Sequence, residues 1–235
     1  MSLPTLLAPG VWRLPTLGGS LVNSFALEEP DGGVTLVDAG LRGATARLLR
    51  HLSAIGKRPD QVARIVVTHA HLDHVGDARR LRERTGGALC IHEGDATYCA
   101  SGTAPPLDHP VARALGSVVG ARIGGGPVDR TFADNELLPV AGGLRVLHTP
   151  GHTPGHCSLL HEPSGVLITG DAIFNWRNRM RYSFAVFCTN GRLSRETADR
   201  LGEVDYEVAA FTHGPEIRER ARDQVRAFLR ARSSS

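Results

Sequence analysis

One short segment, residues 68–76, constrains this chain more than any other. It reads Thr-His-Ala-His-Leu-Asp-His-Val-Gly and brings three imidazoles and one carboxylate into six positions: His69, His71, Asp73 and His74. An apolar run at 65–67, typical of a buried strand, precedes it, and helix-forming residues at 78–84 follow it. Side chains from a strand end and a helix start can converge on one point, and these ligand types suit zinc and similar divalent ions. The alternative is a polar loop that happens to be rich in histidine.

The pattern of short apolar runs and amphipathic stretches predicts an α/β fold. Strand pairs come first and are followed by strands that alternate with helices, which indicates two sheets with helices outside. Within the predicted helix 75–85, Asp77 is expected to face solvent in the first turn, where a negative charge is favourable. The predicted strands are 11–16, 20–27, 34–38, 64–68, 88–91, 144–148, 156–161 and 165–171. The predicted helices are 43–55, 75–85, 93–100, 193–202 and 215–231.

Composition is that of an ordinary soluble protein. The 235 residues are 41% hydrophobic and 22% charged, and the net charge of +3 is spread along the chain, so neither nucleic acid nor a membrane surface is an expected partner. The four cysteines form no CxxC pattern and are expected to be free thiols in a cytoplasmic protein. A single domain over 1–235 is predicted, with a lid or insertion at 101–130, where prolines and glycines gather around an amphipathic stretch at 110–121.

Three further residues have the form of metal ligands at strand ends. His152 follows Pro150-Gly151, Asp171 follows Thr169-Gly170, and His213 precedes Gly214. Glycine at such places lets the backbone turn sharply, so that a short side chain can face a pocket. Each position alone is a weak signal, because a histidine after a strand is more often structural and Asp171 could simply cap a helix. A metal bound at residues 69–74 needs further ligands, and this requirement strengthens the interpretation of His152, Asp171 and His213 as ligands.

The order of these motifs resembles that of the metallo-β-lactamase-fold hydrolases. The motifs are Asp38-Ala-Gly, HxHxDH at 69–74, His152, Asp171 and His213, and the resemblance runs from about residue 11 to 215. It implies a four-layer αβ/βα sandwich, in which two mixed β-sheets lie face to face and are flanked by helices, with a two-metal site at one edge. It also implies that Asp38 lies beneath the site and steadies a metal-binding loop.

The same resemblance implies a ligand set and a reaction. His69, His71 and His152 would bind one metal, Asp73, His74 and His213 the other, and Asp171 would bridge both. Zinc is the expected ion, with iron or manganese as alternatives. A metal-bridging hydroxide would attack a small-molecule ester, thioester or lactone, and Asp73 would orient it and carry a proton as the catalytic residue. A phosphodiesterase is the second version of this hydrolase, and a persulfide dioxygenase-like oxidoreductase with one iron is the rival.

The substrate walls are expected at 101–130 and in the loop after Asp171. Residues 174–184 alternate aromatic and basic side chains, which predicts a rim for a small and anionic substrate. The alternative is a solvated arginine-rich loop with Trp176 in the core. The oligomeric state is left open, with a homodimer as one option. The expected rim residues are Trp176, Arg177, Arg179, Arg181 and Tyr182.

Overall fold

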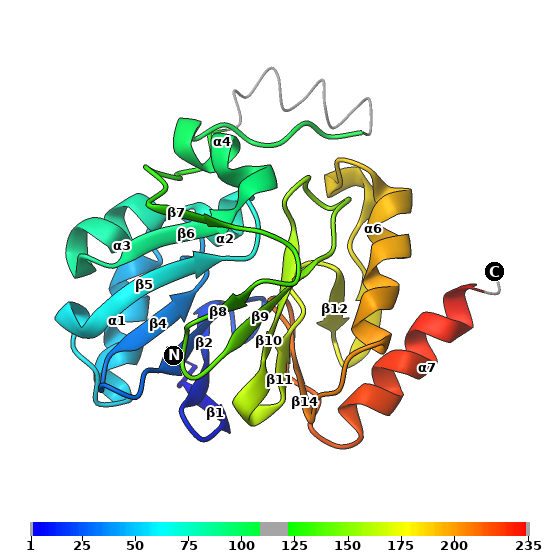
Figure 1. Cartoon of the computed structure of the whole chain (residues 1–235), viewed down its shortest axis with the longest axis horizontal. Coiled ribbons are helices and arrows are strands. Elements are labelled where there is room, and N and C mark those ends of the chain that lie inside the picture. The colour runs from blue at the N-terminus through cyan, green and yellow to red at the C-terminus, as the bar shows by residue number, and fades with distance from the viewer. Residues whose placement is uncertain (1, 109–121, 234–235) are drawn as a thin grey trace.

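The computed structural model describes residues 2–108 and 122–233. Its strands form two large mixed sheets that pack face to face (Figure 1). The first sheet runs in chain order, antiparallel from β1 to β4 and parallel from β4 to β7. Its strands are β1 (Thr5–Ala8), β2 (Val11–Leu17), β3 (Val22–Glu28), β4 (Val34–Val37), β5 (Val62–Val67), β6 (Ala88–His92) and β7 (Arg130–Phe132).

The second sheet has the order β14-β11-β10-β9-β8, and only its β11–β14 pair is parallel. A separate two-stranded hairpin joins neither sheet; it consists of β12 (Ile173–Trp176) and β13 (Arg179–Tyr182). The strands of the second sheet are β8 (Leu137–Leu138), β9 (Leu144–His148), β10 (Cys157–His161), β11 (Val166–Ile168) and β14 (Val208–Ala210).

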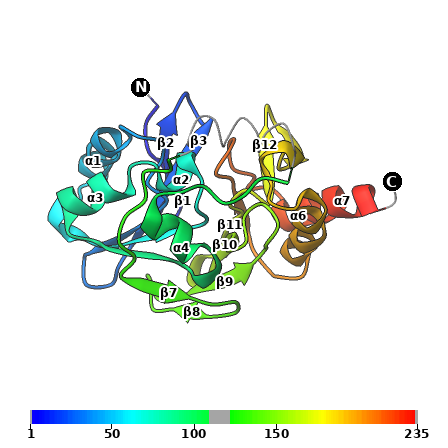
Figure 2. The same cartoon turned by 90° about the horizontal axis from the view of Figure 1, so that it is seen from above.

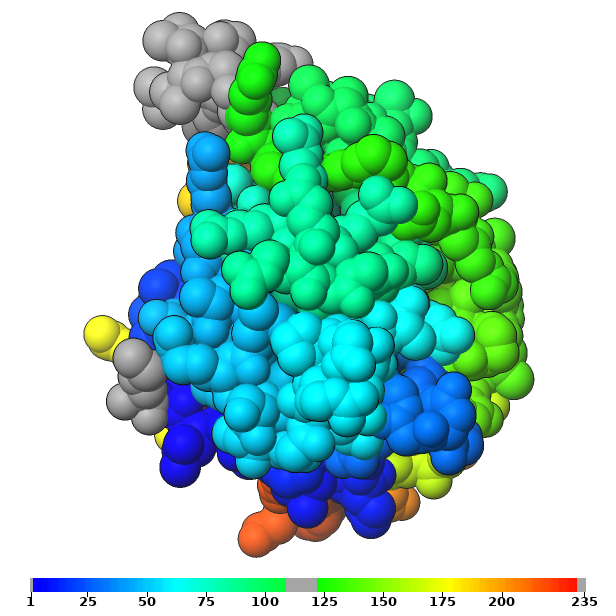
Figure 3. Space-filling view, turned by 90° about the vertical axis from the view of Figure 1, so that its left-hand side faces the viewer, coloured from blue at the N-terminus to red at the C-terminus, as the bar shows by residue number. Residues whose placement is uncertain are grey.

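Helices cover the outer face of each sheet, which completes four layers. Figure 2 shows α1 and α3 on one side of the strands and α6 and α7 on the other. The space-filling view of Figure 3 shows the first of these outer faces, formed by the N-terminal half of the chain. The α-helices of the described residues are α1 (Thr45–Ala54), α2 (Leu72–Val75), α3 (Ala78–Thr85), α4 (Glu93–Ser101), α6 (Gly191–Ala198) and α7 (Ala221–Ser233). Short 3₁₀ turns are η1 (Pro59–Gln61), η2 (Glu162–Ser164), η3 (Ala185–Phe187) and η4 (Asp199–Gly202).

The alternation of side chains along each strand produces three hydrophobic clusters. In β5, Val66 points into the cluster between the sheets, whereas Ile65 and Val67 point toward the helices. Because the central parallel strands are covered on both faces, their sequences read as continuous apolar runs. A third cluster, around Phe211, joins the second sheet to α7. The predicted αβ/βα sandwich of two mixed sheets is thus confirmed.

Two predicted helices have different bounds. The helix predicted at 75–85 begins at Ala78, as α3, and a short division separates it from α2, which ends at Val75; the helix predicted at 215–231 begins at Ala221. Asp77, at the division, does not face solvent: it is buried, and its Oδ2 accepts a hydrogen bond of 2.7 Å from the backbone N–H of Thr45 at the start of α1. The negative charge therefore serves the N-terminus of a neighbouring helix, where backbone donors lack partners.

The predicted insertion at 101–130 is only partly described. Its amphipathic stretch, 110–121, lies outside the described residues. At its borders, Ser101 ends α4, Thr103 forms an isolated bridge with Arg122, and Arg130 begins β7. Among the described helices, none is both long and apolar enough to cross a membrane. All four cysteines are free and buried.

Candidate metal centre

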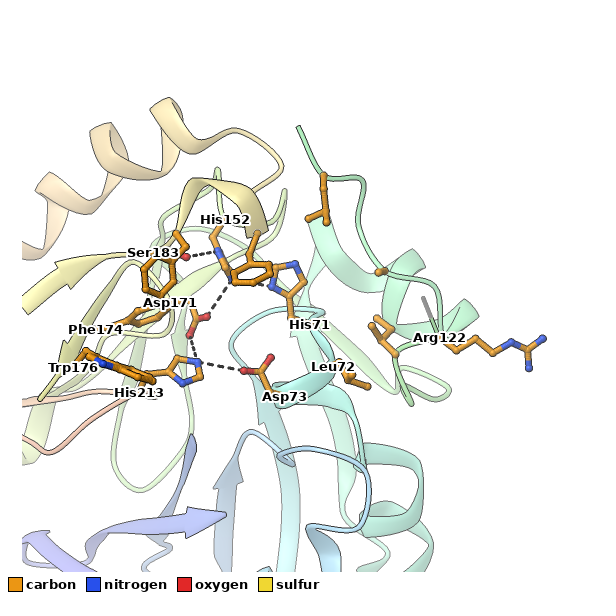
Figure 4. A pocket seen from close by; sticks show the side chains of 15 residues that line it. His71, Leu72, Asp73, Arg122, His152, Asp171, Phe174, Trp176, Ser183 and His213 are labelled. Atoms are coloured by element: carbon orange, nitrogen blue, oxygen red, sulfur yellow. Dashed lines mark hydrogen bonds and ion pairs between the residues drawn. The ribbon is translucent and has the colours of Figure 1, made fainter. Parts of the chain in front are cut away.

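All seven predicted ligand residues lie together at one edge of the sandwich. The first sheet contributes the segment after β5, with His69 and His71 in the loop and Asp73 and His74 in α2. The second sheet contributes His152 between β9 and β10, Asp171 after β11 and His213 after β14. Figure 4 shows five of these side chains pointing toward one another across the gap between the halves.

Glycines beside the ligands adopt backbone angles that other residues avoid. Gly170 precedes Asp171 with a φ of 52°, and Gly214 follows His213 with a φ of 111°. A Cβ on Gly214 would lie 2.0 Å from the carbonyl oxygen of Asn175, so no larger residue fits there. These sharp turns, predicted from the sequence, place the ligands at the site.

Asp171 lies at the centre of the ligand cluster. Its Oδ2 is 3.2 Å from Nε2 of His152, and its Oδ1 is 3.3 Å from Nε2 of His213 and 3.4 Å from Nε2 of His74. Three groups have potential ligand atoms within 4.8 Å of one another and could hold metal ions: His69, His71 and His152; His69, His74 and Asp171; and Asp73, His74 and His213. The carboxylate of Asp171 thus lies between His152, in the first group, and His74 and His213, in the third.

Two buried nitrogen atoms support the fit to metal ions. Nε2 of His69 and Nε2 of His74 are inaccessible to solvent and have no hydrogen-bond partner. Buried polar atoms are normally satisfied, because leaving one unpaired costs about 1–3 kcal/mol. Both atoms face Asp171, at 3.8 Å and 3.4 Å respectively. A cation bound here would give both nitrogens a partner.

The charges of the cluster also favour cations. Burial alone would raise the pKa of Asp171, but the surrounding histidines outweigh it and hold that pKa well below its usual range. Burial likewise opposes protonation of His152 and His213, but Asp171 raises their pKa values to about 9 and about 10. Burial keeps the pKa of His69 well below its usual value. The ionised carboxylate of Asp171, surrounded by imidazoles, therefore favours a bound cation.

Asp38 lies beneath the cluster and orients two of its histidines. Its Oδ2 is 2.8 Å from Nδ1 of His74, and it accepts hydrogen bonds from the hydroxyl of Thr68. The same hydroxyl oxygen is 3.0 Å from Nδ1 of His69. Since these contacts occupy the Nδ1 atoms, the Nε2 atom of each ring is free to bind a metal. Asp38 therefore has the position that the resemblance implied.

Two further histidines, His152 and His213, are oriented by residues that were not predicted from the sequence. Nδ1 of His152 lies 2.8 Å from Oγ of Ser183 and 3.5 Å from Sγ of Cys188, and Nδ1 of His213 lies 2.6 Å from the carbonyl oxygen of Leu21. Thr68 was adjacent to the motif and could have been recognised. The partners of His152 and His213 carry no local signal, because 31 and 192 positions, respectively, separate them from their histidines.

Asp95, also missed, joins the two ligand-bearing loops. It is fully buried in α4, and its carboxylate accepts hydrogen bonds from the backbone of Ala70 at 2.7 Å, the hydroxyl of Thr153 at 2.6 Å and the backbone of Gly155 at 2.6 Å. Burial raises the pKa of this carboxyl. One residue thus fixes the loop that follows β5 relative to the loop that carries His152.

His156 lies behind Asp171 and has a structural role. Its Nε2 accepts a hydrogen bond of 2.7 Å from the backbone N–H of Asp171, and its Nδ1 donates to the carbonyl oxygen of Thr149 at 2.9 Å. Burial lowers the pKa of His156 to about 3, so the ring is neutral and can accept at one nitrogen while donating at the other. This arrangement holds Asp171 in place.

A cavity of about 800 Å³ opens beside the ligands. The candidate ligands His71, Asp73, His152, Asp171 and His213 form one wall of it, and most of its other lining is apolar. The apolar lining residues are Leu72, Ala104, Leu107, Ile123, Phe174, Trp176, Phe184 and Phe187. Arg122 also lines the cavity, although Figure 4 shows its guanidinium group directed away from the ligands.

Of the five expected rim residues, only Trp176 lines this cavity. The segment forms the hairpin β12–β13, with Arg177 in its turn. Cross-strand pairing places Arg179 opposite Trp176 and Arg181 opposite Phe174, and both arginines are exposed to solvent. Tyr182 lies on the other face of the hairpin, with its ring 4.9 Å from that of Phe228 in α7. The alternation along the paired strands thus places Tyr182 on the face opposite to Trp176, whereas Arg179 and Arg181 share the face of Trp176 without lining the cavity.

Comparison with known proteins agrees with this geometry. The family model described as the metallo-beta-lactamase superfamily matches residues 17–213. The uncharacterized protein YobT of Bacillus subtilis is 29% identical, with 94% of this chain and 96% of YobT aligned. A metallo-beta-lactamase family protein from Thermus thermophilus superposes with a TM-score of 0.71 at 28% identity, covering 97% of this chain and 82% of that one.

A third relative is similar over a shorter region. The hydroxyacylglutathione hydrolase of Halorhodospira halophila is 33% identical over 70% of this chain, a region that spans 46% of that enzyme. The match therefore covers more than two thirds of this chain but under half of the relative. Taken with the motif order, the sandwich and the clustered histidines, these similarities show that the chain belongs to the metallo-beta-lactamase superfamily and is a metal-dependent hydrolase.

Proposed function

We propose that this chain is a binuclear hydrolase that cleaves a small-molecule ester, thioester or lactone. The observation that carries the proposal is the position of Asp171, whose two carboxylate oxygens face different histidines, His152 on one side and His213 on the other. A carboxylate so placed can bridge two cations, as in two-metal hydrolytic sites. His69, His71 and His152 would hold one ion, and Asp73, His74 and His213 the other.

Two ions held there would activate a water molecule as the nucleophile and polarise the carbonyl of the substrate. The chain itself supplies orientation and proton transfer. Asp73 lines the cavity, and its Oδ2 lies 3.3 Å from Nε2 of His213. Because its carboxylate is partly exposed to the cavity, Asp73 can receive a proton from the attacking water and pass it to the leaving group.

The relatives support a thioester among the candidate substrates. The name of one relative, hydroxyacylglutathione hydrolase, describes cleavage of an acyl thioester. We propose zinc as the resident metal because the ligand set is rich in imidazole, with iron or manganese as alternatives. We also propose a cytoplasmic location, which the four free cysteines favour.

Metal stoichiometry and a substrate panel test the proposal together. Protein purified without chelator should contain two divalent ions per chain by mass spectrometry of the elements, and should hydrolyse esters, thioesters or lactones with a chromogenic product. Removal of metal should abolish this activity, and added zinc should restore it. One iron per chain, with oxygen uptake on a persulfide and no hydrolysis, would instead indicate a dioxygenase. Turnover of phosphodiesters alone would indicate the phosphodiesterase alternative.

A further inference from the structure

Exposed apolar side chains gather at the mouth of the cavity. Leu72, Trp176, Phe184 and Phe187 line the cavity and are each more than a third exposed, with Phe187 at 55%. Such residues are normally scattered over a surface, and a group of them around a hollow indicates a binding site. They come from three separate elements, α2, β12 and the region of η3.

The aromatic rings continue from the metal ligands outward. The ring of Phe174 meets that of His213 at 4.6 Å in a T-shaped contact, the ring of Phe184 follows at 6.2 Å from Phe174, and the ring of Phe187 lies 6.4 Å from Phe184. Leu72, Leu107 and Ile123 add further apolar surface to the lining of the cavity. A group attached to the bond under attack would therefore contact hydrocarbon over most of its surface.

We infer that the substrate carries a bulky apolar group, a medium-length alkyl chain or an aryl group, next to the bond that is cleaved. This inference rests on the proposed hydrolase function and defines its substrate class. A cavity of about 800 Å³ is within the range that encloses a drug-sized ligand. Among the described residues, Arg122 is the only arginine that lines it, and its guanidinium group points away from the ligands, so the side chains around the cavity offer little positive charge to an extended anionic substrate. Phe184 and Phe187 are the specificity-determining residues.

Two series of esters or thioesters test this substrate class. One series lengthens the acyl group with a constant leaving group, and the other lengthens the leaving group of an acetyl compound. The value of kcat/KM should rise by about fourfold per methylene in at least one series, the factor that corresponds to ~0.8 kcal/mol per buried CH₂. Hydrolysis that is independent of chain length in both series would overturn the inference and leave the proposed function intact.

Variants at the mouth provide the second measurement. Phe187→Ala should lower the ratio of kcat/KM for long over short substrates by roughly tenfold, as expected for the loss of a large apolar contact. Since Phe187 is exposed, its removal should not impair folding. Leu137→Ala is the matched control, because Leu137 is 46% exposed but lies on β8, away from the cavity. An unchanged ratio in Phe187→Ala would contradict the assignment.

Binding can be measured without turnover. The chain has two tryptophans, so Trp12→Phe leaves Trp176, on the cavity wall, as the single reporter. In metal-free protein, 1-octanol should change the Trp176 fluorescence saturably, at a concentration at least tenfold below that for 1-butanol. Phe187→Ala in this background should raise the octanol midpoint, and Leu137→Ala should not. Equal midpoints for the two alcohols would overturn the inference, whereas octanol binding without any hydrolysis would overturn the proposed function instead.

Discussion

Nδ1 of His74 lies 2.8 Å from Oδ2 of Asp38, and both side chains are buried. Through the hydroxyl of Thr68 the same carboxylate also reaches His69. Asp38 has a φ of 63°, a left-handed conformation in which asparagine and aspartate are enriched among residues other than glycine. A single carboxylate, fixed by a turn at the end of β4, therefore sets the direction of two candidate ligands, which the proposed binuclear arrangement assigns to different ions.

Asp38→Asn should weaken metal binding by about 10- to 100-fold while preserving the turn. Asparagine tolerates the left-handed backbone, but its amide has neither the negative charge nor the second acceptor oxygen that Thr68 and His74 share. Competition with a chromophoric chelator measures the affinity. Asp60→Asn, at an exposed position in η1, is the control. Affinity equal to that of the unmodified protein would show that Asp38 does not orient the ligands.

Asp171→Ala should lower both metal content and hydrolysis, because it removes the carboxylate that faces His152 and His213. We expect metal affinity to fall at least as far as for Asp38→Asn, by roughly 100-fold or more. Elemental analysis after equilibrium dialysis gives the number of ions per chain. A variant that keeps two ions and full activity would rule out a bridging role for this residue.

Asp95→Ala should destabilise the metal-free protein by about 2–4 kcal/mol. The substitution leaves the buried backbone donors of Ala70 and Gly155 unpaired, and each such donor costs about 1–3 kcal/mol. Urea denaturation followed by circular dichroism measures the free energy of unfolding. Glu93→Ala changes an exposed acidic residue in the same first turn of α4 and should have little effect. Equal stability of the two variants would contradict the role assigned to Asp95.

The stability of the protein should fall in mild acid, partly through His92. Burial, together with the nearby His148, lowers the pKa of His92 to about 4 from an unfolded value of 6.5. The unfolded chain therefore binds a proton that the folded chain excludes, so this contribution to stability is lost as the pH falls from about 6.5 toward 4.

His92→Asn should reduce this loss. Nδ1 of His92 accepts a hydrogen bond of 3.1 Å from the backbone of Gly94 at the start of α4, and the asparagine side chain can provide the same acceptor without titrating. The free energy of unfolding is compared at pH 7 and pH 4.5 for both proteins, loaded with metal. An identical decrease in the free energy of unfolding of the two proteins would show that His92 does not contribute to the loss of stability in acid.

The ligands could be predicted because their signals are local. Four lie within 69–74, and His152, Asp171 and His213 each stand beside a glycine at a strand end. The residues that orient the ligands could not be predicted, because Asp95 and Ser183 lie 58 and 31 positions, respectively, from the residues that they contact, Thr153 and His152. Asp77 was misplaced for the same reason: its charge does belong at a helix N-terminus, but at that of a helix 32 positions earlier in the chain.

The hairpin was missed because its turn lacks the usual signal. Arg177 and Asn178 adopt φ values of 52° and 59°, conformations that favour glycine, and neither residue is glycine. The sequence therefore suggested a loop in which aromatic and arginine side chains between 176 and 182 together formed a rim around the substrate. Paired strands instead send Trp176 to the cavity and Tyr182 to α7, a division that depends on register and cannot be read from composition.

The hairpin β12–β13 separates the part of the cavity wall that contacts the substrate from the part that carries the candidate metal ligands. The base of the hairpin is held in place by two hydrogen bonds. The backbone N–H of Asn175 donates to the carbonyl oxygen of His213 at 2.9 Å, and the hydroxyl of Thr212 donates to Asp171 at 2.8 Å. The tip at Arg177 and Asn178 belongs to neither large sheet. A change in the length of the hairpin would therefore move Trp176, which lines the cavity, without displacing the candidate ligands, so the shape of the cavity can change independently of the metal centre.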